Sequence, residues 1–353
     1  MKKNYFLMAA AAAMFAACSE TDMVNAVNEA QVEAQNAISF EAFAGKATRA
    51  EYSNTNLPGS FAVWGWKTAA AATPDWSAGA ITQVFDEVVA TKSGDVYDYA
   101  NKVYWDKTST YKFFAVAPGE EPTGVSYTIS GVGGFITIDG AESAKAADSE
   151  DYLITRAAEL QAGTASTTPV TFDFHHTMSK VSFVVANSLT DKEIVITSLT
   201  MTKWNDSKGK FVQTSNVAPN AGKTSGFVCD EWSLADGVMD GAATLIGTGA
   251  SETTVTLAAG ANQTLTDSYI FVPQTITAIL DAGVPTDGLT FTLTYEIGTE
   301  VFEGHVGILP TQVWGTDMHT TYTINVGPDA ITFGEPTVCA WHPNNATGST
   351  SIQ

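Results

Sequence analysis

Short segments rich in Val, Ile, Thr, Tyr, Phe and Trp recur along the chain, and clusters of Gly, Asn, Asp and Pro separate them. Such segments form strands rather than helices, because β-branched and aromatic residues suit a pleated surface and the intervening residues suit turns. Clear examples are SFAVWGW (60–66), YKFFAVAP (111–118), VTFDFH (170–175), KVSFVVAN (180–187) and LTFTLTYEI (289–297). The sequence therefore predicts an all-β fold of Greek-key β-sandwich type.

The chain is longer than a single hydrophobic core usually serves, so we expect two domains in tandem. A small, polar stretch, ELQAGTASTTP (159–169), marks a break in composition. We place an N-terminal β-sandwich domain at 50–168 and a C-terminal one at 169–330. Within the second, SLTMTKWNDSKGKFVQTS (198–215) is predicted to form a hairpin that turns at Asn205 to Gly209.

Residues 1–18 are typical of an export signal. Lys2 and Lys3 precede an apolar run that is too short to span a bilayer, and the run ends at Ala-Ala-Cys18. This ending resembles a bacterial lipobox, in which the cysteine is acylated; the alternative is an ordinary signal peptide with an incidental cysteine. Residues 19–36 lack aromatic residues, Gly and Pro and are expected to be a tether, and ISFEAFAG (38–45) alternates as a strand does.

The chain is strongly acidic, with a formal net charge of −21 at pH 7. Loss of residues 1–49 would change this charge by only one unit, because that segment carries nearly balanced charges. A field of this sign repels nucleic acid and anionic membrane surfaces, so neither is expected as a partner. Contact with the outer membrane is expected only through the lipid of the precursor.

No catalytic or metal-binding motif is found in the sequence. His175 and His176 are adjacent on a predicted strand, so their side chains point to opposite faces and cannot converge on one metal ion. His176 is expected on the side of Phe172 and Phe174, and His175 beside Asp173, both as structural residues. We therefore expect no enzyme activity, no cofactor and no metal site.

Two further groups of residues are candidate binding sites. DSEDY (148–152) is acidic but lacks the spacing of a calcium loop, so a solvated acidic turn is favoured over a weak calcium site. Trp64, Trp66 and Trp76 are candidates for stacking on sugars. Trp64 and Trp66 share one strand face, however, which favours a place in the core.

The order of several motifs resembles the fimbrillins, the type V pilus subunits of the Bacteroidales. The resemblance covers nearly the whole chain and rests on the lipobox, KATRA (46–50), and the β segments VYWD, YKFFAVAP, FDFHHTMSKVSFVV, SYIFVPQT, VWGTDMHTTYTINV and ITFGEPTVCAWHP. It implies a major or minor fimbrial protein that is made as a palmitoylated, outer-membrane lipoprotein and matures into a cell-surface fimbrium.

The resemblance also implies a route of assembly. An arginine-specific protease would cut the bond between Arg49 and Ala50 and remove a strand within residues 37–49. The groove left behind would accept the tail of a neighbouring subunit, residues 331–353, by strand addition. In that tail Ile331, Phe333, Thr337, Cys339 and Trp341 alternate on one face with Val338 on the other, and Gly334 and Pro336 are expected to divide the pairing into two short segments.

The remaining cysteines leave alternatives open. Cys229 and Cys339 are either a disulfide, within the subunit or between neighbours, or two free thiols.

The sequence leaves two interpretations of the function open. The first is a structural subunit of an adhesive pilus, in the stalk or an accessory position, with neighbouring subunits and a host or bacterial receptor as partners. The second is a permanently anchored lipoprotein that binds glycans and does not polymerise. Fractionation would separate the two, because only the pilin loses its acylated N-terminus.

Overall fold

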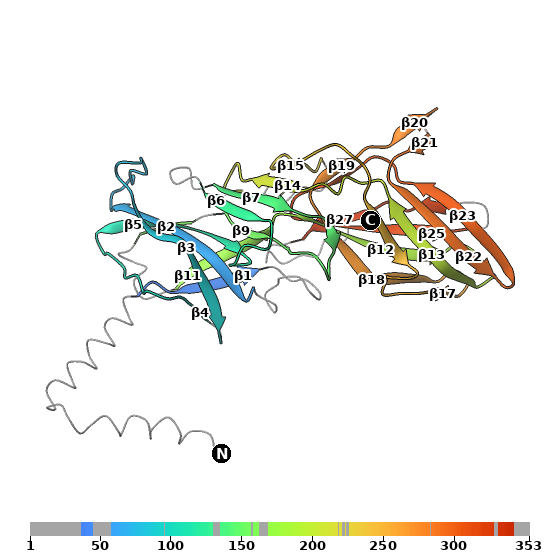
Figure 1. Ribbon diagram of the computed structural model, residues 1–353, viewed down its shortest axis with the longest axis horizontal. Coiled ribbons are helices and arrows are strands. Elements are labelled where there is room, and N and C mark those ends of the chain that lie inside the picture. Colours follow the sequence, from blue (N-terminus) through green and yellow to red (C-terminus); the bar gives the residue numbers. More distant parts are fainter. Residues whose placement is uncertain are drawn as a thin grey trace, which may run out of the picture.

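The computed structural model describes residues 37–44, 58–94, 96–129, 135–156, 158–161, 169–217, 219–220, 223, 226–282, 284–327 and 331–341. Every regular element within these ranges is a β-strand, which confirms the prediction of an all-β fold. The molecule is elongated, with β1 (Phe40–Ala44) and β5 (Ser109–Ala117) at one end and β22 (Thr290–Ile297) and β23 (Glu300–Ile308) at the other (Figure 1). In the described ranges, no helix is both long and apolar enough to cross a membrane.

The largest sheet has eight strands and closes on itself. Its order is β10-β5-β2-β3-β4-β1-β11-β9, and β9 also pairs with β5. We call this sheet the N-terminal barrel; its strands are β1 (Phe40–Ala44), β2 (Ser60–Ala69), β3 (Thr82–Ser93), β4 (Val96–Asp98), β5 (Ser109–Ala117), β9 (Leu153–Thr155), β10 (Ala158–Gln161) and β11 (Val170–His176). The side chains that point inward form an aromatic core that includes Phe40, Phe61, Phe85, Phe113 and Phe172.

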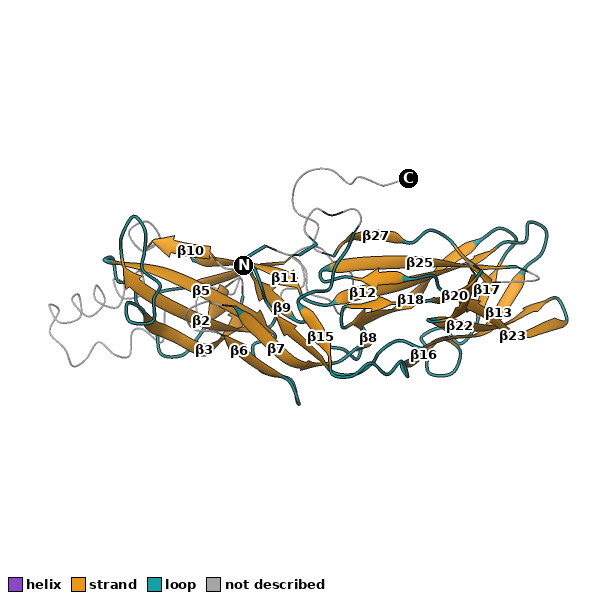
Figure 2. Ribbon diagram, turned by 90° about the horizontal axis from the view of Figure 1, so that it is seen from above, coloured by secondary structure: helices purple, strands orange, loops and turns teal. Residues whose placement is uncertain are grey.

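A four-stranded sheet covers the outer side of part of the barrel (Figure 2). It contains β6 (Ser126–Ile129), β7 (Ile136–Ala141), β14 (Gly209–Val212) and β15 (Trp232–Leu234). Trp64, Trp66 and Phe114 of the barrel pack there with Ile138 and Phe211. The prediction that Trp64 and Trp66 belong to the core is confirmed.

Two more sheets face each other at the other end of the molecule and enclose one apolar core. The first contains β8 (Ala144–Lys145), β12 (Ser179–Asn187), β18 (Asn262–Phe271), β25 (Met318–Val326), β26 (Ile331–Phe333) and β27 (Thr337–Ala340). The second contains β13 (Ile194–Thr202), β16 (Ala242–Ile246), β17 (Val255–Leu257), β22 (Thr290–Ile297) and β23 (Glu300–Ile308). Two small ribbons complete the fold: β19 (Gln274–Ile276) with β24 (Gln312–Trp314), and β20 (Ile279–Asp281) with β21 (Val284–Asp287).

The predicted hairpin at 198–215 is wrong. β13 pairs with β16, β17 and β22, whereas β14 pairs with β7 and β15, so the two strands lie in different sheets. The reason is that their inward side chains belong to different cores: Leu199 and Met201 enter the core of the distal sheets, and Phe211 enters the core outside the barrel. The connection is fixed by Asn205, whose backbone N–H donates to the side chain of buried Gln274.

Strand pairing does not stop at residue 168. β11 begins at Val170 and pairs with β1 and β9 of the barrel, and β14 returns to pair with β7. The polar stretch around 162–168 lies outside the described residues.

Candidate functional site

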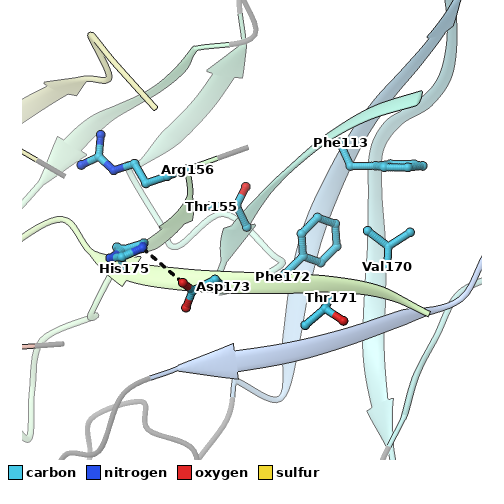
Figure 3. A pocket seen from close by; sticks show the side chains of 8 residues that line it. All are labelled: Phe113, Thr155, Arg156, Val170, Thr171, Phe172, Asp173 and His175. Carbon is cyan, nitrogen blue, oxygen red and sulfur yellow. Dashed lines mark ion pairs between the residues drawn. The ribbon is translucent and has the colours of Figure 1, made fainter. Parts of the chain in front are cut away.

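The strand that precedes the predicted cleavage site is an integral part of the barrel. β1 runs parallel to β11 from the pair Phe40 and Val170 to the pair Ala44 and Phe174 (Figure 3), and on its other side Phe40 pairs with Tyr97 of β4. The alternation of ISFEAFAG thus predicts a strand correctly. Cys18, Arg49 and Ala50 lie outside the described residues.

Phe40 occupies the centre of the barrel core and is fully buried. Its ring lies 5.3–6.3 Å, centroid to centroid, from the rings of Phe61, Phe85, Tyr99, Phe113 and Phe172. Most of these contacts are edge-to-face or tilted, the arrangements that the ring quadrupole favours. A strand that leaves this position therefore leaves a large apolar hole.

The residues just before β1 are also held through their backbone. The Ile38 N–H donates to the Val103 carbonyl at 2.8 Å, and the Tyr99 hydroxyl donates to the Ile38 carbonyl at 2.8 Å. The Val170 N–H donates to the Ser39 carbonyl at 2.7 Å. A hollow of about 490 Å³ beside these residues is lined by Ala37, Ile38, Ser39, Tyr97, Tyr99 and Tyr104. On residues 38 and 39 these bonds involve only backbone groups. Any strand that follows the same backbone path can therefore form them.

The predicted donor tail lies on its own subunit. β26 pairs with β25 through Ile324 to Val326, and β27 pairs with β25 through Met318 to Thr321. The residues between them, Gly334 to Pro336, are not in a strand, so the tail does pair as two short segments. The physical reason is that proline has no N–H to contribute to a ladder.

The tail side chains do not form one buried face in this position. Ile331 and Trp341 are buried, Phe333 and Val338 are partly buried, and Thr337 and Cys339 are exposed. The interruption at Gly334 to Pro336 breaks the alternation between the two segments.

Trp341 ends the described tail and is buried at the edge of the apolar core outside the barrel. The Trp341 ring stacks on His176 with centroids 4.0 Å apart and planes 2° apart, and the backbone N–H of Trp341 donates to the Asp317 carbonyl at 2.9 Å. His176 Nδ1 lies 2.9 Å from Asp151 Oδ1. The interpretation of DSEDY as a solvated turn is therefore wrong for Asp151, which is buried because it pairs with this histidine.

The two histidines lie on opposite faces as the strand period predicts. His176 is buried on the same side as Phe172 and Phe174, and His175 is only partly buried, with Nε2 3.7 Å from Asp173 Oδ2. His175 Nδ1 also lies 3.6 Å from Asp317 Oδ2, in the turn before β25. The second of these pairs joins the barrel to the turn that leads into β25, the strand on which the tail lies.

Both remaining cysteines are free thiols in the structure. Burial raises the pKa of the Cys229 thiol, so it is a weak nucleophile at neutral pH. The Cys339 thiol faces the backbone of β25, 3.7 Å from the His319 carbonyl.

His319 supports the strand on which β27 lies, and its pairing partner there is Cys339. Burial, and next the charge of Lys180, lower the pKa of His319 to about 4, and its Nε2 lies 2.9 Å from the Ser182 hydroxyl. The ordinary pKa of histidine is 6.5. Between pH 6.5 and pH 4, His319 is therefore protonated in the unfolded chain but neutral in the folded one. Stability is therefore complete above pH 6.5 and decreases as the pH falls toward 4.

We expect this one group to remove up to about 3 kcal/mol of the free energy of unfolding between pH 7 and pH 4. Urea denaturation of the wild-type chain and of His319→Asn at both pH values measures it, because the asparagine stays neutral. The wild type should lose more stability than the variant by about that amount. Parallel losses in the two proteins would contradict the assignment.

The arginine side of the barrel is a buried ion pair rather than an open binding site. Arg156 donates to both oxygens of Glu231, at 3.1 and 3.0 Å, and the two side chains are 5% and 1% exposed. The adjoining cavity, of about 110 Å³, is lined by Thr155, Thr171, Asp173 and His175 beside the ring edges of the core (Figure 3). Its volume is well below the roughly 300 Å³ of an ordinary ligand pocket.

No group of three or more His, Cys, Asp or Glu side chains is placed to hold a metal ion within the part of the chain that the structure describes. The arrangement that stands out is a central barrel strand directly before a basic residue, together with a tail that lies on the edge of another sheet.

This chain resembles known proteins in its fold and, over most of its length, in its sequence. A fimbrial protein of Bacteroides vulgatus has a similar structure, with a TM-score of 0.61 at 16% sequence identity, over 87% of this chain and 99% of that one. The tip fimbrial protein Mfa3 of Porphyromonas gingivalis matches with a TM-score of 0.35 at 11% identity, over 86% and 100% of the two chains. A search of curated proteins found no match. The sequence model of the fimbrillin-like family matches residues 48–341, most of the chain, and the protein therefore belongs to the fimbrillin-like family.

Proposed function

We propose that this protein is a structural subunit of an adhesive pilus that polymerises by donor-strand exchange. Export as a lipoprotein acylated at Cys18 brings the precursor to the outer membrane, and cleavage after Arg49 prepares it for assembly. The mature subunit, residues 50–353, is part of a cell-surface fimbrium in a stalk or accessory position. Two tandem domains, N-terminal and C-terminal, carry the acceptor groove and the donor tail.

The observation that supports this proposal is the position of β1. It lies between β4 and β11 in the wall of the barrel. Residues 45–57, which include Arg49, connect it to the rest of the chain. A cut after Arg49 severs the only covalent link that holds β1 in place. Once β1 has left, Val103, Val170 and Tyr99 lose their hydrogen-bond partners and the aromatic core loses Phe40. Such an unfinished sheet is strongly disposed to accept another strand.

The tail is suited to leave. β26 makes three residue pairs and β27 four, all with β25, at the edge of a sheet. Short edge strands open locally at a lower free energy than central strands do. A subunit can thus donate its tail to a neighbour while the sheets that enclose its own core stay intact.

Cleavage of the folded precursor by an arginine-specific protease tests the proposal. The chain has only two arginines, and Arg156 is buried in its pair with Glu231, so the only accessible cut should be after Arg49. We expect Ala50 as the new N-terminus, followed by ladders of oligomers on unheated gels. N-terminal sequencing and size-exclusion chromatography measure the two steps.

Arg49→Lys is the matched control, because it keeps the charge but is not a substrate of this protease. It should remain uncut and monomeric. A precursor that is cut at Ala50 and remains monomeric at high concentration would contradict polymerisation and favour an anchored glycan-binding protein. Failure to obtain Ala50 would contradict the processing step.

A further inference from the structure

The tetrapeptide that leads into β1 occurs again, with one change, where the chain enters β26. Ala-Ile-Ser-Phe stands at 37–40, and Ala-Ile-Thr-Phe stands at 330–333. The only difference is Ser39 against Thr332, and both are hydroxyl residues that point away from the apolar face. In both copies the isoleucine and the phenylalanine are two residues apart, so they lie on one face of a strand.

We propose that β26 of a second copy of this chain takes the place of β1, with Ile331 in the site of Ile38 and Phe333 in the site of Phe40. This inference rests on the proposed function and adds to it the donor residues and their register. The donated strand would run parallel to β11, as β1 does.

The backbone anchors of the barrel fit this register. In the precursor Val103, Tyr99 and Val170 bind the backbone of Ile38 and Ser39. With Ile331 in the place of Ile38, its N–H meets the Val103 carbonyl and its carbonyl meets the Tyr99 hydroxyl. The Val170 N–H then meets the Thr332 carbonyl. A shift by one residue would turn Ile331 and Phe333 toward solvent.

The barrel sites of Ile38 and Phe40 are also more deeply buried than the sites that Ile331 and Phe333 occupy on their own subunit. Ile38 is 1% exposed and Phe40 is fully buried, whereas Ile331 is 8% exposed and Phe333 only partly buried. Phe40 has five aromatic neighbours, whereas Phe333 on its own subunit has one among the described rings, Phe291, whose centroid is 5.2 Å away and whose plane is tilted by 53°. Movement of β26 from its own sheet to the barrel of a neighbour therefore gains apolar burial, which gives the exchange a direction.

The site that Ile331 and Phe333 occupy on their own subunit is also shaped to fit these two side chains. A Cβ atom on Gly307 of β23 would lie 2.9 Å from Ile331 Cγ2 and 3.1 Å from Phe333 Cε2. The glycine leaves the room in which the tail rests before assembly. After Phe333 the two copies diverge, and Pro336 limits how far the donated strand can pair along β11.

Paired cysteines test the register. Thr171 pairs with Glu41 of β1, so in the proposed register Gly334 of the donor lies opposite Thr171 of the acceptor. We would introduce T171C and G334C together, with C229S and C339S, cleave the protein and oxidise it mildly. At home a Cβ on Gly334 meets Thr323 at an ordinary 3.5 Å, so G334C fits the precursor.

We expect a covalent ladder from T171C/G334C that is roughly tenfold stronger than from T171C/T332C, because a shift of two residues separates the Cα atoms by about 8 Å. The same variant with Arg49→Lys should give no ladder. Stronger crosslinking from T171C/T332C, or unheated ladders without crosslinks from either pair, would overturn the register and leave polymerisation standing. If the C229S/C339S parent forms no oligomers after cleavage, the proposed function itself fails.

Discussion

Replacing Phe40 by alanine is expected to lower the free energy of unfolding of the uncleaved precursor by about 3–5 kcal/mol. The side chain is fully buried, and five aromatic rings surround it. Because these rings come from several strands of a closed sheet, they cannot all move inward to fill the hole. The expected loss is therefore at the upper end of the range for large-to-small substitutions.

Glu41→Ala is the matched control on the same strand. Glu41 is exposed and faces Thr171 on the outer side, so its removal should change stability by no more than about 0.5 kcal/mol. Guanidinium denaturation of both variants in the Arg49→Lys background, followed by tryptophan fluorescence, gives the comparison. A loss below about 1 kcal/mol for Phe40→Ala would mean that β1 is not part of the barrel core.

The same substitution separates two roles of β1 after cleavage. If β1 stays in the barrel only through noncovalent contacts, the cleaved Phe40→Ala protein should release its N-terminal peptide faster than the wild type. The vacated barrel still carries the site for a donated phenylalanine, so oligomers should form sooner. The precursor loses stability while the assembled form keeps its own, because assembly replaces the strand that carries the substitution.

Local patterns in the sequence predicted the strands but not their partners. The period of two placed His176 with Phe172 and Phe174, and it placed Trp64 beside Trp66. Pairing depends on which core receives the inward side chains, and the sequence of β13 and β14 says nothing of that choice. β1 and β11 are parallel neighbours separated by more than a hundred residues, which no local turn signal can indicate.

At the candidate site, too, the sequence predicts the strands but not the residues that they contact. A strand before Arg49 and a tail of two short segments follow from alternation and from Pro336. Asp151, Tyr99 and Val103 are hydrogen-bond partners that the sequence did not reveal, since each binds a residue far away in the chain. The one available signal was the second copy of Ala-Ile-Ser/Thr-Phe, which becomes meaningful only when the structure places one copy in a core and the other at an edge.

Trp341→Ala is expected to release the end of the tail from its own subunit. Trp341 is 3% exposed and its ring stacks on His176, whereas the bond from its backbone N–H to the Asp317 carbonyl is kept in the alanine variant. Loss of a buried tryptophan side chain costs about 3–5 kcal/mol. If most of this falls on local opening of β27, the amide protons of β27 should exchange faster by a factor of about 10²–10³.

Hydrogen exchange of the uncleaved protein measures the opening, and oligomer formation after cleavage measures its consequence. Thr337→Ala, at an exposed position of β27, should leave both unchanged, and Trp341→Phe should give an intermediate effect because it keeps a ring over His176. Faster exchange together with faster oligomer formation means that departure of the tail limits assembly. Unchanged exchange in Trp341→Ala would mean that β27 is held by its pairing with β25 alone, and that the stacked ring does not control the tail.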